Sequence, residues 1–256
     1  MPFFLAASNT AHAGVDSAKL AEAGRLLSQW DRRYTRDDTR AVLFELAMRE
    51  LSIRTWDELD DEAKGARPAP GAFGEPSTTP ARAVNVPTAI LAELLADSAS
   101  AWWDVRRTGD RVEHRDDVVA ASLVAALDSA RRKYGEPDAG GWTWSRMRHA
   151  NIKHLLQIPA LGALDLPVQG GPSTIAPSPG TGTHGPSWRM VVELGPEVHA
   201  MSIYPGGQSG NPLSPRYKDR IGKWLAGELD TLFVPHAASE MAGARSAGAL
   251  TLVPGR

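Results

Sequence analysis

The sequence of 256 residues contains no cysteine. Disulfide scaffolds, thiolate zinc sites, iron–sulfur clusters and cysteine nucleophiles are therefore excluded. An excess of positive charge is also missing, because 28 Lys and Arg residues are set against 30 Asp and Glu residues. Binding nucleic acid through its phosphates requires a basic surface, so we expect no nucleic-acid partner. Export remains open, since a chain of this length can build a core without disulfides.

Long hydrophobic runs are missing as well. No stretch of the sequence approaches the roughly 18 apolar residues that a membrane-spanning helix requires, so we expect no membrane partner. The first residues, Met1–Ala13, form a poor signal peptide, because the apolar stretch Phe3–Ala7 is short and no Lys or Arg precedes it. We expect either a cytoplasmic protein, if the chain is expressed alone, or a chain whose true beginning lies elsewhere.

Glycine and proline are scarce in the first half of the chain and abundant in the second. Residues 1–134 hold 12 of the 43 Gly and Pro residues, and residues 135–256 hold the other 31. The distribution predicts a mainly helical part over 1–134. It also predicts a part of strands and loops over 135–256, with one helix at about 214–226. With 42% hydrophobic residues overall, we expect both parts to form one globular structural unit.

Apolar residues three or four positions apart predict helices in the first part. One such pattern consists of Leu20, Gly24, Leu27 and Trp30, and a second of Leu43, Leu46, Ala47 and Leu51. Thr35 followed by Asp38 resembles a capping box at the start of the second helix.

Two further helices follow the Pro- and Gly-rich stretch 68–87. A short one, with Pro87 in its first turn, is predicted from Ile90, Leu91, Leu94 and Leu95. The clearest one begins at Asp116 and Asp117 and ends at Gly135. Its apolar face consists of Val119, Leu123, Ala126, Leu127, Ala130 and Tyr134.

The second part contains strand patterns and one capped helix. The run 188–194 predicts a strand, and 200–204 predicts its partner after the turn at Gly195 and Pro196. Ser214 and Pro215 are typical of a helix N-cap and first turn, and Gly227 is typical of a helix end. The segment 250–253 predicts one last edge strand.

Five patterns suggest a site, and each has a simpler explanation. His149 and His154 are five residues apart, which does not align two metal ligands on a helix, so no metal site is predicted. Gly180, Gly182 and Gly185 have the spacing of a dinucleotide-binding loop, but Pro177 and Pro179 stand where a strand is required.

Ser209 follows Gly207, but Asn211 stands where a serine-hydrolase elbow needs a second glycine, so a tight turn is the better interpretation. The acidic run 57–62 predicts a solvated surface, and Trp142 and Trp144 predict core packing. The residues alone therefore predict no catalytic residue, no metal ligand and no cofactor site, and leave the substrate-binding residues unknown.

Several segments, taken in order, resemble one family. The segment 30–38, Trp-Asp-Arg-Arg-Tyr-Thr-Arg-Asp-Asp, resembles the Trp-Asp helix of the penicillin acylase (penicillin amidase) family. Trp142-Thr143-Trp144, with His149, His154 and Gly170-Gly171, resembles the next stretch, and the run 189–194 resembles the Arg-bearing strand. The segment 205–217 is close to the Gly-Gln-Ser-Gly tail. Arg32 and Ser145 depart from the family pattern, where glycine is common.

The resemblance implies an α+β chain that supplies part of a four-layer αββα sandwich of the N-terminal nucleophile hydrolases. These enzymes cleave acyl amides, such as β-lactam side chains or N-acyl-homoserine lactones, through an acyl-enzyme. Their nucleophile is the first residue of the large chain, where a free amine stands beside the hydroxyl. The matched region is the C-terminal part of that chain, and here Met1 is followed by Pro2. No catalytic residue is carried over, and we expect this chain alone to be inactive.

The resemblance also implies partners and a location. The partners are a small-molecule acyl amide and the missing upstream part of the enzyme, namely its small chain and the N-terminal part of its large chain. The family's oxyanion-hole asparagine and structural calcium ligands lie upstream too, so we expect no cofactor in this chain. Full-length members are periplasmic or secreted. The alternative function is a non-catalytic binding or interaction module that retains part of the scaffold.

Overall fold

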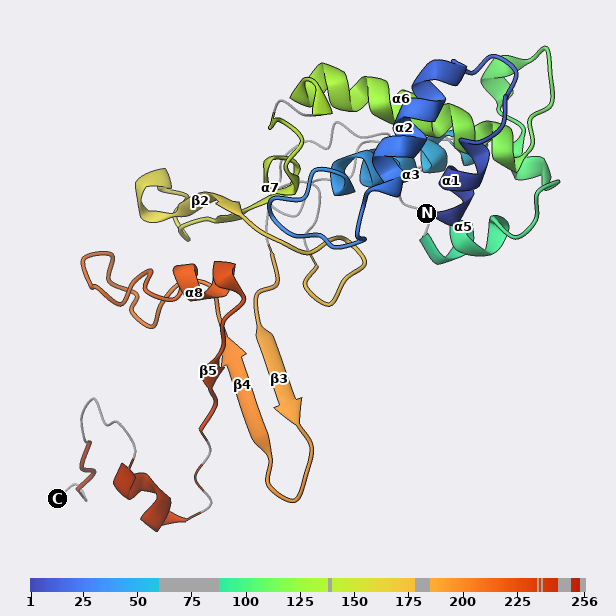
Figure 1. Ribbon diagram of the computed structural model, residues 1–256. Helices are drawn as coiled ribbons and strands as arrows, with labels where there is room; N and C mark the ends of the chain where they lie inside the picture. The colour runs from blue at the N-terminus through green and yellow to red at the C-terminus, as the bar shows by residue number, and fades with distance from the viewer. Residues whose placement is uncertain are drawn as a thin grey trace. The chain divides into compact units, whose positions relative to one another are not determined.

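The computed structural model describes residues 1–59, 88–137, 140–177, 185–233, 235, 237–243 and 250–253. They form two compact units, Met1–Gly185 and Pro186–Arg256, coloured blue to yellow and orange to red in Figure 1. The Pro87 start of the short helix and the glycines Gly180 and Gly182 lie outside the described residues. Within the described residues, no helix has the length and apolar character needed to cross a membrane.

The first unit is a helical layer with one small hairpin. Its α-helices are α1 Pro2–Ala7, α2 Ser17–Ser28, α3 Ala41–Thr55, α5 Thr88–Leu94, α6 Arg115–Tyr134 and α7 Trp144–Met147. Short 3-10 turns lie at η2 Ala101–Trp103, η3 Arg106–Thr108 and η5 Pro159–Leu161. Strands β1 His149–Ile152 and β2 Ala163–Pro167 pair antiparallel, with Ala150 opposite Leu166. The combination confirms the predicted α+β class.

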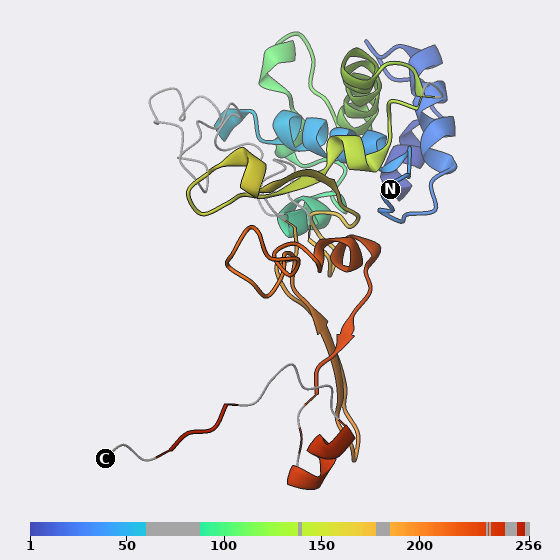
Figure 2. The ribbon, with the colours of Figure 1, turned by 90° about the vertical axis from the view of Figure 1, so that its left-hand side faces the viewer.

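Helix α6 is the centre of the helical layer, and it has the face that the sequence predicts. All six residues of that apolar face are buried, and α6 packs along α3, as both ribbon views show (Figures 1 and 2). Asp117 accepts a hydrogen bond from the His114 backbone N–H at the start of the helix, at 3.2 Å. Gly135 ends the helix with a φ of 81°, a conformation that favours glycine.

Helix α2 also confirms its predicted pattern, since Leu20, Gly24, Leu27 and the following Trp30 are all buried. Gly24 of α2 faces Ser8, the residue that follows α1. A Cβ at this position would lie 2.5 Å from the Ser8 Cβ, so the residue that follows α1 requires a glycine opposite it. Asp16 is the N-cap of this helix, and its carboxylate accepts from the Ala18 and Lys19 backbone N–H groups.

The predicted capping box before α3 is wrong. The helix begins at Ala41, and Asp38 Oδ1 accepts hydrogen bonds from the backbone N–H groups of Arg40, at 2.9 Å, and of Ala41, at 2.6 Å. Thr35 lies too far before the helix start to cap it. The predicted apolar stripe of α3 is buried at Leu43, Ala47 and Leu51.

The second unit is built on one antiparallel ribbon. Strands β3 Arg189–Glu193, β4 His199–Ile203 and β5 Asp230–Thr231 pair in that order, with helix α8 Ile221–Ala226 between β4 and β5 in sequence and the 3-10 turn η6 Ala238–Gly243 after them. The hairpin predicted from 188–194 and 200–204 is confirmed. The segment 250–253 is described without a strand, so the predicted last edge strand is wrong; its backbone pairs with no strand of the described sheet.

Helix α8 is shorter than predicted. It begins at Ile221 rather than near Ser214, because the residues from Ser214 to Arg220 form turns. Ser214 Oγ accepts from the Arg216 backbone N–H at 3.2 Å, so it closes an exposed turn and does not cap the helix. The predicted end is confirmed, since Gly227 has a left-handed φ of 79°. Trp224 is buried, and its Nε1 donates to the Pro186 carbonyl at 2.9 Å.

Truncating Trp224 should destabilise the second unit far more than truncating Ser214. Emptying a buried Trp site costs about 3–5 kcal/mol, whereas an exposed substitution stays within about 0.5 kcal/mol. We expect Trp224→Ala to accelerate amide hydrogen exchange throughout β3 and β4, and Ser214→Ala to leave it unchanged. Equal protection in the two variants would show that Trp224 does not anchor the ribbon.

Candidate functional site

The family-like motifs of the first unit meet in one contact cluster, which we call the Tyr34 cluster: Tyr34, Glu45, Trp144, Arg148, Gly170 and Gly171. The rings of Tyr34 and Trp144 lie 4.9 Å apart, centre to centre. Trp144 Nε1 donates to the Gly170 carbonyl at 2.7 Å, and the Gly170 N–H donates to the Tyr34 carbonyl at 2.8 Å. A Cβ on Gly171 would lie 3.0 Å from the Tyr34 ring, so glycine allows this close approach. The motifs thus position one another.

Three polar side chains, of which Arg148 is buried and Tyr34 and Glu45 are partly buried, complete the cluster. Tyr34 donates its hydroxyl proton to Glu45 Oε1 at 2.6 Å, and Arg148 Nη2 lies 3.8 Å from the other Glu45 oxygen. Burial raises the pKa of Glu45, although the Tyr34 hydrogen bond and the Arg148 charge oppose the rise. Burial likewise lowers the pKa of Arg148 and raises that of Tyr34. The three side chains hold one another in place inside the helical layer.

The tryptophan pair confirms the packing interpretation. Trp142 and Trp144 are both fully buried, and Trp142 Nε1 donates to the Gly135 carbonyl at 2.7 Å. Each indole therefore uses its one donor on a backbone carbonyl. The N–H groups of Trp144 and Ser145 donate to the Asp38 and Arg36 carbonyls, which connects the start of α7 to the segment before α3.

Arg32, which stands where the family commonly has glycine, has a φ of 66°. This left-handed conformation costs a residue with a Cβ about 1–2 kcal/mol, and glycine adopts it freely. A glycine at position 32, as the resemblance leads us to expect, would adopt this conformation without that cost.

Ser209 belongs to a turn. Its Oγ accepts from the Asn211 backbone N–H at 3.1 Å, and its own N–H donates to the Arg216 carbonyl at 3.2 Å. Gly206 has a φ of 106°, and a Cβ on Gly207 would lie 2.0 Å from the Arg216 carbonyl oxygen. The glycines are required by this turn, in agreement with the interpretation made from the sequence.

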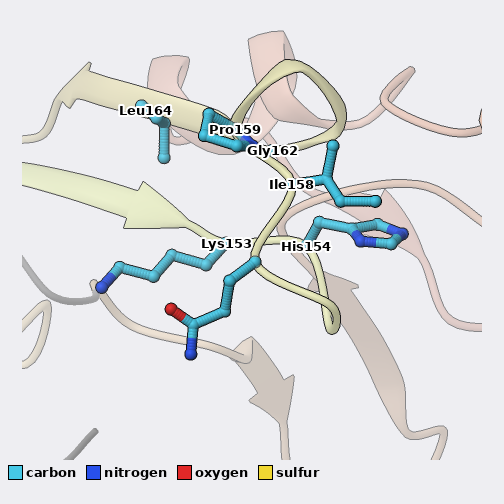
Figure 3. A pocket seen from close by; sticks show the side chains of 7 residues that line it. Lys153, His154, Ile158, Pro159, Gly162 and Leu164 are labelled. Atoms are coloured by element: carbon cyan, nitrogen blue, oxygen red, sulfur yellow. The ribbon is translucent and has the colours of Figure 1, made fainter. Parts of the chain in front are cut away.

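The two histidines lie on a strand and in a loop, not on a helix. His149 on β1 places its Nε2 3.6 Å from Asp165 Oδ1 on the neighbouring strand. His154 Nδ1 accepts from the Leu156 N–H at 3.2 Å, and the residue lines a cavity of about 160 Å³ at the tip of the β1–β2 hairpin, shown in Figure 3. Within the described residues, no three His, Asp or Glu side chains gather closely enough to hold a metal ion.

The sequence did not predict one hydrogen-bonded row of a hydroxyl, an imidazole and a carboxylate. His12 lies between Thr10 Oγ1 and Asp117 Oδ1, at 2.9 Å from each. Burial raises the pKa of Asp117, but hydrogen bonds from His12 and the His114 backbone outweigh it and hold that pKa below its ordinary value. His12 Nε2 also lies 3.1 Å from the Ala7 carbonyl oxygen. These hydrogen bonds connect the end of α1 to the first turn of α6. No sequence pattern connects residues 105 positions apart.

The predicted solvated acidic run is wrong at its first residue. Asp57 is buried just beyond the end of α3, and burial raises the pKa of its carboxyl, while Arg107 and Arg106 oppose the rise. Residues 60–62 of the run lie outside the described part of the chain. Burial of Asp57 follows from its place beside the core residue Trp56, which charge composition does not reveal.

Comparison with known proteins gives these motifs a common origin. The model of the penicillin amidase family matches residues 3–240. The chain belongs to the penicillin amidase family. It is 30% identical over 243 residues to the acyl-homoserine lactone acylase QuiP of Pseudomonas putida, covering 90% of this chain and 28% of that protein. It is 27% identical to QuiP of Pseudomonas fluorescens strain Pf-5, covering 94% of this chain and 29% of that protein.

A solved structure shows the same fold. The thermostable penicillin G acylase from Alcaligenes faecalis matches with a TM-score of 0.51 and 18% sequence identity, covering 100% of this chain and 46% of that chain. The predicted fold class, part of an N-terminal nucleophile hydrolase sandwich, is confirmed by this match. The chain spans less than a third of the length of its curated relatives, which are larger proteins.

The family glycine should suit position 32 better than arginine does. We expect Arg32→Gly to raise the free energy of unfolding by up to about 1 kcal/mol, the left-handed strain less the entropy that glycine adds to the unfolded chain. Arg33→Gly is the matched control, since Arg33 has no left-handed backbone, and it should lower stability. Urea denaturation measures both, and destabilisation of equal size in the two variants would contradict the argument.

The raised pKa of Glu45 should make stability depend on pH. A carboxyl with a raised pKa in the folded state stabilises the fold fully below its unfolded pKa, close to 4.5, and this contribution disappears as pH rises through the folded pKa. We expect wild type to lose stability relative to Glu45→Gln as the pH rises from about 4 to 7.5. Urea unfolding across that range measures the difference, and a constant or opposite trend would refute the assignment.

Proposed function

We propose that this chain is a portion of an amidohydrolase that cleaves acyl amides through an acyl-enzyme, with the nucleophile on polypeptide outside this chain. One observation carries the proposal: the family match extends over residues 3–240, yet the chain covers only 28% and 29% of the two curated acylases. The larger share of such an enzyme therefore lies elsewhere.

The described residues support a scaffold role for this portion. Motifs that carry the family resemblance contact one another in the Tyr34 cluster, where Trp144 Nε1 donates to a backbone carbonyl and the Tyr34 hydroxyl donates to Glu45. Within the turn at Ser209, the hydroxyl oxygen accepts from a backbone N–H. Side chains bonded in this way stabilise the local fold of the chain. The N-acyl-homoserine lactone is the favoured substrate class within the proposal, because both curated relatives are named acyl-homoserine lactone acylases.

The proposed reaction follows the chemistry of N-terminal nucleophiles. The hydroxyl attacks the amide carbonyl, the terminal amine beside it accepts the proton, and the released amine takes that proton as the carbon–nitrogen bond breaks. Water then hydrolyses the acyl-enzyme. In this scheme the present chain supports the site and supplies none of the reacting atoms.

The test compares this chain alone with a reconstituted pair. We expect the purified chain to release no homoserine lactone from N-acyl-homoserine lactones. Mixed with the part of the Pseudomonas putida acylase outside the 243 aligned residues, it should give turnover. Each part alone, and a mixture with denatured chain, are the controls. Turnover by the chain alone that disappears in Ser209→Ala would place the nucleophile here and overturn the proposal. A complex without turnover would favour the binding-module alternative.

A further inference from the structure

The hairpin of β1 and β2 in the first unit encloses a cavity of about 160 Å³ at its tip (Figure 3). We call it the hairpin pocket, and its lining side chains are those of Lys153, His154, Gln157, Ile158, Pro159 and Leu164. An apolar cavity of about 150 Å³ is large enough to hold a benzene molecule. The hairpin pocket therefore has room for a compact organic ligand.

Backbone hydrogen bonds fix the loop around the hairpin pocket. The Gln157 N–H donates to the His154 carbonyl at 2.7 Å, and the Gly162 N–H donates to the Pro159 carbonyl at 3.0 Å. Gln157 also has a left-handed φ of 54°, which is unfavourable for a residue with a Cβ. Backbone outliers of this kind cluster at ligand-binding sites. The loop thus preforms the walls of the pocket.

One side of the hairpin pocket is apolar. Figure 3 shows Ile158, Pro159 and Leu164 above the cavity. Ile158 and Leu164 are each 42% exposed, so both have apolar surface left to bury. Contact with an apolar group of a ligand would remove that surface from water, which favours binding. This side of the pocket therefore selects a ligand with an apolar body.

The other side of the hairpin pocket offers hydrogen-bond donors and positive charge. Lys153 and His154 lie below the cavity in Figure 3, and Lys153 carries an ammonium group. His154 Nδ1 accepts from the Leu156 N–H at 3.2 Å, so a neutral imidazole holds its proton on Nε2 and is a donor there. None of the described residues that line the pocket is acidic. A carboxylate, which only accepts hydrogen bonds, matches this side.

We propose that the hairpin pocket binds a small carboxylate whose apolar body is about the size of a benzene ring. The carboxylate accepts hydrogen bonds from Lys153 and His154, and the apolar body packs against Ile158 and Leu164. Both parts of the ligand are required, because the pocket joins a donor side to an apolar side. The proposal is independent of the proposed function, since the residues that it uses all belong to this chain.

A series of three probes tests the chemistry of the ligand. Benzoate has both required parts, benzylamine has a similar ring with a positive charge, and acetate has the carboxylate without the ring. Each probe is titrated into the full chain, and binding is followed by the backbone amide signals in two-dimensional NMR spectra. We expect benzoate to bind with a Kd of about 1 mM or below. Benzylamine and acetate should bind roughly tenfold more weakly or less, and the benzoate shifts should centre on residues 153–164.

Two pairs of variants test the residues. Lys153→Met removes the charge from the pocket, and Lys133→Met removes the same charge from α6, outside the pocket. We expect the first to weaken benzoate binding roughly tenfold and the second to change it by less than about twofold. Leu164→Ala should weaken binding about threefold, and Leu155→Ala should not, because Leu155 is 93% exposed and does not line the pocket. Circular dichroism checks folding, and Lys153→Gln replaces a Lys153→Met variant that does not fold.

Each contrary outcome identifies what is wrong. Unchanged benzoate affinity in both Lys153→Met and Leu164→Ala, no saturable binding by wild type, or shifts centred outside the hairpin would overturn the proposal. Benzylamine binding as tightly as benzoate would show a ring site without charge selection, and acetate binding as tightly would show an anion site without the apolar contact; either result overturns it too. Because the assay measures binding to this chain alone, its failure would leave the proposed function unchanged.

Discussion

The close approach of the Tyr34 ring to Gly170-Gly171 is the constraint on which the arrangement of the first unit depends. Two backbone groups and one indole fix it, because the Gly170 N–H donates to Tyr34 while its carbonyl accepts from Trp144. The segment after α2, the start of α7 and the chain leaving β2 therefore converge at one point. A Cβ at position 171 would lie 3.0 Å from the Tyr34 ring, so the ring, which also holds the hydrogen bond to Glu45, would have to shift by a few tenths of an ångström.

The spacing of apolar residues predicted the helices of the first unit correctly, but it predicted their first residues less well. The stripes of α2 and α6 are buried as expected, since an amphipathic face needs only correct spacing to be visible in sequence. The starts of α3 and α8 were placed too early, for the same physical reason. Thr35 and Ser214 have cap chemistry, yet Asp38 binds the N–H groups of Arg40 and Ala41 just before α3, and Ser214 closes a turn. Any small polar side chain can satisfy a nearby N–H, and sequence does not say which one.

The sequence allowed candidate catalytic residues to be judged, but it did not reveal the contacts of the cluster. The residues around Ser209 favoured a turn, and the five-residue spacing of His149 and His154 favoured no metal site. The contacts that organise the first unit could not be predicted, because the fold brings His12 to Asp117 and Tyr34 to Glu45. The burial of Asp57 could not be predicted for a related reason. A carboxylate is expected to be exposed to solvent unless its neighbours in the folded structure are known.

The two units differ in how many hydrophobic side chains they bury, and this difference bears on function. The first encloses a continuous core in which three tryptophans, at 103, 142 and 144, are fully buried. The second encloses Ile203 and Trp224, and its Trp188, Met190 and Tyr204 side chains are each about half exposed. Hydrophobic stabilisation scales with the apolar area removed from water, so the core of the first unit contributes more of this stabilisation than that of the second. In the proposed enzyme the nucleophile lies on polypeptide outside this chain, so the well-packed first unit serves as scaffold and supplies none of the reacting atoms.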